Sequence, residues 1–125
     1  LVVPKNDYSL NLDYRFSTES LPGKLDANLN YTHRDSTSTP HDLNGTMMYS
    51  DVYTTTPAFG IWNARIALSQ IKAGPSNNGR VTVALWIKNL TDRKYLTMVN
   101  PGWVTDMSGN WGEPRTVGMD LVYKY

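Results

Sequence analysis

The residues of this chain that could do chemistry are few and scattered. A hydrolase needs a nucleophile, a base and a group that orients the base, and Ser9, His33 and Asp13 are of those types. Ser9 and Asp13 alternate with apolar neighbours, whereas His33 is in line with the apolar residues of its own segment. Since alternate residues of a strand face opposite ways, the three side chains are not expected to meet. The sequence therefore predicts a protein that is not an enzyme.

Groups that bind metals are also sparse. His33 and His41 have no metal-like spacing, and the chain contains no cysteine. Structural and catalytic zinc sites need Cys, His and carboxylate ligands, often at short spacings. We therefore expect neither a protein-bound metal nor another cofactor. The lack of cysteine also excludes disulfides and leaves the redox compartment open.

Charge and hydropathy exclude two further classes of protein. Twelve Lys and Arg residues against 11 Asp and Glu give a net charge of +1, which is not a basic footprint for nucleic acid. The 125 residues are enough for one domain, and no run of about 18 apolar residues predicts a transmembrane helix. Leu1 is not a start methionine, and "LVVPKNDYSL" lacks the layout of a secretion signal. We therefore expect the chain to be cut from a longer one.

Alternation of apolar and polar residues is the dominant pattern. Successive side chains of a strand point to opposite faces, and segments of this chain alternate in that way over about 9–12 residues. An ordinary globular strand has about 5–6 residues, whereas a tilted strand that crosses a membrane needs about 9–11. We predict an all-β chain, an antiparallel up-and-down meander of about five long strands. Their approximate ranges are 8–17, 24–34, 60–71, 80–98 and 114–125.

The connections between these segments alternate between short and long. "STESLPG" and "KAGPSNNG" are short turns, whereas the connections around 35–60 and 99–113 are long. Short turns at one end and long loops at the other are typical of outer-membrane barrels, and aromatic residues such as Tyr8 and Trp62 resemble the girdles at a membrane interface. A soluble β-sandwich binding module would show similar alternation, and it stays open as an alternative.

The alternation breaks at "NLTD". Leu90 changes face between Asn89 and Asp92, whose side chains can bond to nearby backbone groups. We predict a structural kink or bulge here, near the boundary of the membrane. Arg115, in the next segment, is expected to pair with an acidic residue on the polar face.

Two motifs stand near the end of the chain, "NLTDRKY" and "GEPR" followed by a terminal aromatic residue. Together they resemble the C-terminal end of a TonB-dependent outer-membrane receptor, and "VPKNDYSLNLDYRF" and "FGIWNARIAL" are similar to strands further upstream in that family. The resemblance covers nearly the whole chain, as the last five strands of a 22-stranded transmembrane β-barrel. The motif residues are Asn89, Leu90, Asp92, Tyr95, Gly112, Pro114, Arg115 and Tyr125.

The resemblance implies a transport role in the outer membrane of a Gram-negative bacterium. The chain would be a wall fragment of an active transporter that takes up a scarce nutrient, with a ferric siderophore as the leading expectation. Cobalamin and sugars stay open as alternative substrates. TonB would supply energy through a plug region that this chain lacks. Five strands cannot close a barrel, so the fragment is not expected to transport anything alone.

The resemblance also assigns roles to the last strand and to the long loops. Outer-membrane lipid would cover the apolar side of the last strand, and that strand would be the signal for the barrel-assembly machinery, carried by Met119, Leu121, Tyr123 and Tyr125. Exposed aromatic residues on loops are common binding anchors. The residues considered for substrate contact are His41, Met47, Met48, Tyr49, Tyr53, Trp103 and Trp111. For most of them, packing of loop against loop is the favoured alternative.

Overall fold

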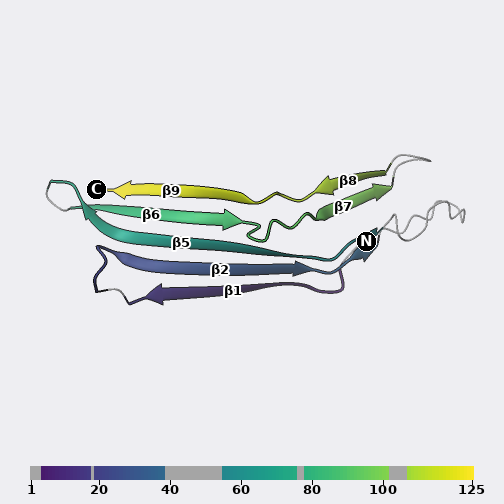
Figure 1. Ribbon diagram of the computed structural model, residues 1–125, viewed down its shortest axis with the longest axis horizontal. Coiled ribbons are helices and arrows are strands. Elements are labelled where there is room, and N and C mark those ends of the chain that lie inside the picture. Colours follow the sequence, from purple (N-terminus) through teal and green to yellow (C-terminus); the bar gives the residue numbers. More distant parts are fainter. Residues whose placement is uncertain (1–3, 18, 39–54, 76–77, 102–106) are drawn as a thin grey trace, which may run out of the picture.

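The described residues form one antiparallel sheet and two small ribbons (Figure 1). The computed structural model describes residues 4–17, 19–38, 55–75, 78–101 and 107–125. The sheet has the order β1-β2-β5-β6-β9, formed by β1 (Asp7–Phe16), β2 (Lys24–Arg34), β5 (Phe59–Ala73), β6 (Gly79–Lys88) and β9 (Thr116–Lys124). The prediction of an all-β chain with an antiparallel sheet of five strands is confirmed for the described residues. Within them, no helix has the length and hydropathy needed to cross a bilayer.

The ribbons lie at one end of the sheet and the short turns at the other (Figure 1). β3 (Thr37–Ser38) pairs with β4 (Thr55–Thr56), and β7 (Leu96–Pro101) pairs with β8 (Met107–Trp111). We call this the ribbon end. The turns that join β1 to β2 and β5 to β6 lie at the opposite end, together with the C-terminus, and we call this the turn end.

The register places apolar residues opposite one another across all five strands. Tyr14 pairs with Ala27, Ala27 with Ile66, Ile66 with Leu85, and Leu85 with Met119. Because residues directly opposite each other share a face, such rows form one continuous surface, which we call the apolar face. A neighbouring row consists of Leu12, Leu29, Ala64, Ile87 and Val117.

The sheet is not covered by a second layer of the described chain. Ile61, Ala67 and Ala84 are the only buried apolar residues in the described ranges. On the apolar face, Leu12 remains 64% exposed and Met119 65% exposed. A single sheet therefore carries its apolar face without a core to bury it.

β5 contains a bulge near the turn end. The pairing of β5 with β6 shifts between Leu68 and Ile71, and Gln70 has a φ of 60°. One extra residue changes the face to which all later residues of a strand point. The bulge therefore returns Ile71 to the apolar face, and the break of alternation in "LSQI" is its trace in the sequence.

The predicted strand at 80–98 is two strands in the structure. β6 ends at Lys88 and β7 begins at Leu96. The chain turns between them because Asn89 and Asp92 have φ values of 50° and 53°, in the left-handed region that an extended strand cannot contain. The described part of the last long connection is not a loop throughout, because the β7–β8 ribbon occupies much of it and Trp111 lies in a strand.

Candidate functional site

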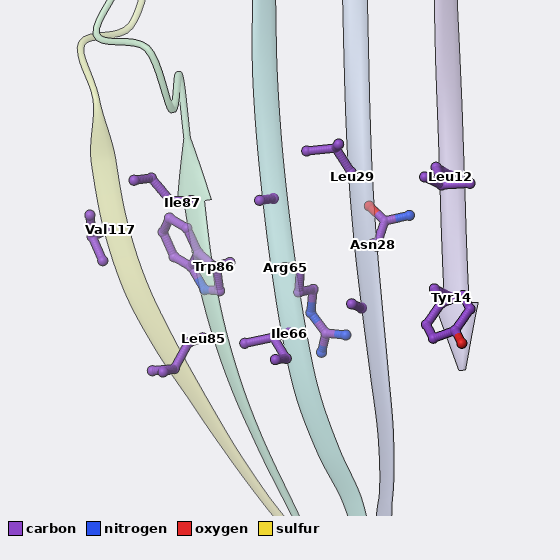
Figure 2. Close-up of a pocket in the computed structure, with 12 residues that line it drawn as sticks. Leu12, Tyr14, Asn28, Leu29, Arg65, Ile66, Leu85, Trp86, Ile87 and Val117 are labelled. Atoms are coloured by element: carbon purple, nitrogen blue, oxygen red, sulfur yellow. The ribbon is translucent and has the colours of Figure 1, made fainter. Parts of the chain in front are cut away.

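A shallow hollow lies in the middle of the apolar face (Figure 2). Its volume is about 500 Å³, and all five strands of the sheet contribute to its lining. The apolar side chains that Figure 2 labels around it are Leu12, Tyr14, Leu29, Ile66, Leu85, Ile87 and Val117. Asn28, Arg65 and Trp86 also border the hollow. Its lining is thus mostly apolar, a kind of surface that favours contact with other apolar groups over water.

The opposite face of the sheet carries a network of amide and hydroxyl groups. Asn28 donates through Nδ2 to Asp13 Oδ1 at 2.6 Å and to Asn11 Oδ1 at 3.1 Å. Asn30 donates to Ser9 Oγ at 3.0 Å, and Asn63 donates to Asn30 Oδ1 at 3.3 Å. We call these six residues the polar ladder. They bond to one another across β1, β2 and β5, so the side chains of the polar ladder have their partners within the sheet.

Ion pairs flank the polar ladder at both ends. Arg15 Nε lies 2.8 Å from Asp26 Oδ1 toward the turn end, and Arg34 Nη2 lies 2.8 Å from Asp7 Oδ2 toward the ribbon end. Each pair joins residues that are directly opposite in the β1–β2 register. Opposite charges in such positions help to fix the register of two strands.

The three residue types of a hydrolase are separated by the sheet. Ser9 and Asp13 belong to the polar ladder, whereas His33 pairs with Tyr8 in the register and stacks on its ring at 5.0 Å. His33 Nε2 lies 3.0 Å from Asp35 Oδ1. The hydrogen bond with His33, and a second from Asn6, lower the pKa of Asp35 below its ordinary value.

In the described part of the chain, no group of three or more His, Asp or Glu residues could hold a metal ion.

Asn89 fastens the end of β6 to two later segments. It is only 2% exposed, and its Nδ2 donates to the backbone oxygens of Arg93 at 2.9 Å and Glu113 at 3.1 Å. Its Oδ1 accepts from the Arg93 N–H at 2.8 Å, and its own N–H donates to Asn63 Oδ1 at 3.0 Å. Asparagine tolerates the left-handed conformation at this position. We call Asn89, Arg93 and Glu113 the Asn89 clasp.

The other residues of the two end motifs contact one another in pairs. Asp92 Oδ1 accepts from the Arg115 N–H at 3.3 Å, and the Arg115 guanidinium lies 3.8 Å from Asp92 Oδ2. Asp92 is thus the acidic partner of Arg115, and it lies in the turn after β6 and not on the polar face where the partner was expected. The Gly112 N–H donates to the backbone carbonyl oxygen of Tyr95 at 2.8 Å. A Cβ on this glycine would collide with the Tyr95 ring. The Tyr95 ring packs in turn on Phe59, with a centroid distance of 4.4 Å.

The residues predicted as the assembly signal lie on an edge strand. Met119, Leu121 and Tyr123 pair with apolar residues of β6, and no described strand pairs with the other side of β9. Tyr125 lies beyond the end of β9 and is fully exposed. The strand therefore presents both an apolar face and a free backbone edge.

Six of the seven residues considered for substrate contact fall within residues 39–54 and 102–106. His41, Met47, Met48, Tyr49, Tyr53 and Trp103 lie outside the described residues. Trp111 lies in β8 and is 68% exposed.

A set of glycine–aromatic contacts was not predicted from the sequence. A Cβ on Gly118 would collide with the Trp86 ring, which lies directly opposite in the register, and a Cβ on Gly60 would collide with Tyr31. Each glycine leaves room for a ring from the neighbouring strand, an arrangement that helps to pin strand register. Only the register reveals these pairs, because the partners are far apart in the sequence.

Comparisons of the chain with protein-family models, with curated proteins and with solved structures found no match in any of the three. The features of the chain that bear on its function are the two faces of the sheet, its edges and its end motifs.

Proposed function

We propose that this chain forms five strands in the wall of an outer-membrane β-barrel. The observation that carries the proposal is the apolar face, which is continuous across five strands and exposed on each outer strand. Burial of apolar surface is worth about 25 cal/mol per Å², and a large exposed apolar patch marks a contact with lipid or with another protein. Lipid chains would cover this face, and the polar ladder would face the lumen.

The lengths of the strands support a membrane location. β1, β2 and β9 have 10, 11 and 9 residues. A strand of ten residues spans about 33 Å, which at a tilt of about 40° covers an apolar band about 25 Å tall. Charged residues also avoid the apolar face along β1, where Asp13 and Arg15 lie on the face of the polar ladder.

The free edges support a larger barrel. β1 and β9 each pair with a described strand on one side only. Within hydrocarbon, each unpaired backbone group costs several kcal/mol, so sheets cross membranes only as closed barrels. We therefore propose that further strands continue this sheet at both edges.

The end motifs support a narrower assignment, to a TonB-dependent receptor with a 22-stranded barrel. On this proposal the receptor takes up a scarce nutrient, with a ferric siderophore as the first substrate to test. TonB would act on a plug region outside these strands, and β9 would be recognised by the barrel-assembly machinery. The contacts of Asn89, Asp92 and Arg115 give the motif residues a structural role at the ribbon end.

Refolding from urea into lipid vesicles and into plain buffer tests the wall assignment. We expect protease-resistant β-structure with vesicles and aggregation in buffer alone. A soluble monomer that unfolds cooperatively in buffer would contradict the assignment and would favour a β-sandwich binding module. The transport assignment has its own test, because loss of the gene product should abolish growth on a ferric siderophore as the sole iron source.

A further inference from the structure

We infer that the ribbon end of the apolar face carries a binding site for the phosphate headgroup of an anionic lipid, with Arg93 as its cation. The inference rests on the proposed membrane location. It adds a specific lipid contact to a wall that would otherwise bind lipid only through its apolar side chains.

An aromatic cluster closes the apolar face at this end. The rings of Tyr31 and Trp62 lie 4.5 Å apart, and the Tyr8 ring stacks on His33 at 5.0 Å and lies 6.3 Å from Tyr31. We call these four residues the rim cluster. Amphipathic rings of Trp and Tyr prefer the level of the lipid headgroups, so this end of the face would lie at the membrane–water interface.

A hollow of about 520 Å³ lies beside the rim cluster. Tyr31, His33 and Trp62 line one part of it, and Thr91 and Arg93 line another. The last two belong to the turn between β6 and β7, which the Asn89 clasp fastens to the sheet. The hollow therefore joins an apolar surface to a hydroxyl group and a guanidinium group.

Charge favours an anion in this hollow. Arg15, Arg34 and Arg115 each have a carboxylate partner, whereas no carboxylate of the described residues forms an ion pair with Arg93. The nearby Asp35 bonds to His33. An arginine that lacks a carboxylate partner matches the geometry of a phosphate, to which it can donate two parallel hydrogen bonds.

The position of the hollow favours a lipid over a soluble phosphate. Trp62 lies on β5 two residues before Ala64, which belongs to the row from Leu12 to Val117. A headgroup at Arg93 would therefore leave its acyl chains to run along the apolar face, where they are needed to cover it. A soluble phosphate would gain nothing from these apolar neighbours.

Brominated lipids test the site through tryptophan fluorescence. The full chain is refolded into phosphatidylcholine vesicles that contain a minor fraction of phosphatidic acid, and bromine is placed on one lipid or on the other. Trp62, one of four tryptophans, is the reporter, and W62F identifies its signal. We expect phosphatidic acid to be enriched roughly fivefold to tenfold at Trp62 over its mole fraction. The enrichment should fall as salt is added.

Two variants separate the site from general charge. R93Q should abolish the enrichment, whereas R115Q should preserve it because that guanidinium is already paired with Asp92. If R93Q fails to refold, the salt dependence of the wild-type chain decides the question. Three results would overturn the headgroup site and leave the wall assignment standing. They are equal quenching of Trp62 by both brominated lipids, enrichment of phosphatidic acid that salt does not change, and complete displacement of phosphatidic acid by inorganic phosphate. Quenching by neither lipid would overturn both.

Discussion

Replacement of Asn89 by alanine should loosen the connection between β6 and the β7–β8 ribbon. The side chain makes three hydrogen bonds within the Asn89 clasp, at 2.8, 2.9 and 3.1 Å. Each is worth about 0.5–1.5 kcal/mol net, which gives about 3 kcal/mol in total. Alanine at a φ of 50° adds about 1 kcal/mol, because its Cβ disfavours the left-handed region. We therefore expect N89A to lose about 4 kcal/mol of local stability.

Hydrogen exchange measured by mass spectrometry reads this loss directly. The Arg93 amide donates to Asn89 Oδ1, so it exchanges only when the clasp opens. A loss of about 4 kcal/mol corresponds to exchange that is several hundredfold faster in peptides that contain residue 93. Peptides from β1 should not change, because that strand is at the far edge of the sheet.

Two further variants divide the effect into its parts. Asn89→Gly also loses the three bonds but accepts the positive φ, so its exchange should be about fivefold slower than that of N89A. Asn78→Ala is the matched control, because Asn78 is exposed in the turn between β5 and β6. Exchange at Arg93 that is unchanged in N89A would refute the reasoning about the clasp. Equal exchange in N89A and N89G would refute only the part that concerns φ.

Three other predictions follow from the two faces and the ribbon end. Met119→Lys places a charge on the apolar face and should cost about 2–4 kcal/mol of stability in vesicles by urea titration, whereas Thr82→Lys, on the polar face, should cost less than about 1 kcal/mol. Gly118→Val should shift the Trp86 emission and lower the urea midpoint, because its side chain would occupy the place of the Trp86 ring. Asp35 has a lowered pKa in the folded chain, so its contribution to stability is complete above its ordinary value of 3.8 and is lost as the pH falls below it. Asp35→Asn should remove that part of the acid dependence, and an unchanged acid profile would contradict the pairing with His33.

The two faces of the sheet could be predicted from the sequence because alternation is a local property. Leu10, Leu12 and Tyr14 stand two residues apart, and any extended chain places them on one side. The pairing of β1 with β2 and of β5 with β6 also followed, because short turns between strands favour antiparallel neighbours. The boundaries of β2, Lys24–Arg34, coincide with the predicted range.

Features that depend on register or on backbone conformation could not be predicted in full. "NLTD" indicated a kink, but its sequence does not give the distant partners of Asn89, Glu113 and Asn63. The pairing of Gly118 with Trp86 depends on the register of β6 with β9. The hollow at Arg93 requires the turn after β6 to reach the ends of β2 and β5, and no local pattern encodes that.

On the proposed function, one face of this sheet meets lipid and the other meets water. The chain has no cysteine, so single cysteines for spin labels can be introduced at each position of β9, from Thr116 to Lys124. In vesicles, two collision rates of each spin label are compared. One is the rate with oxygen, which concentrates in lipid, and the other is the rate with a water-soluble nickel complex. We predict a period of two residues, with collisions with oxygen favoured at Val117, Met119, Leu121 and Tyr123. Uniform access of the nickel complex along β9 would contradict it.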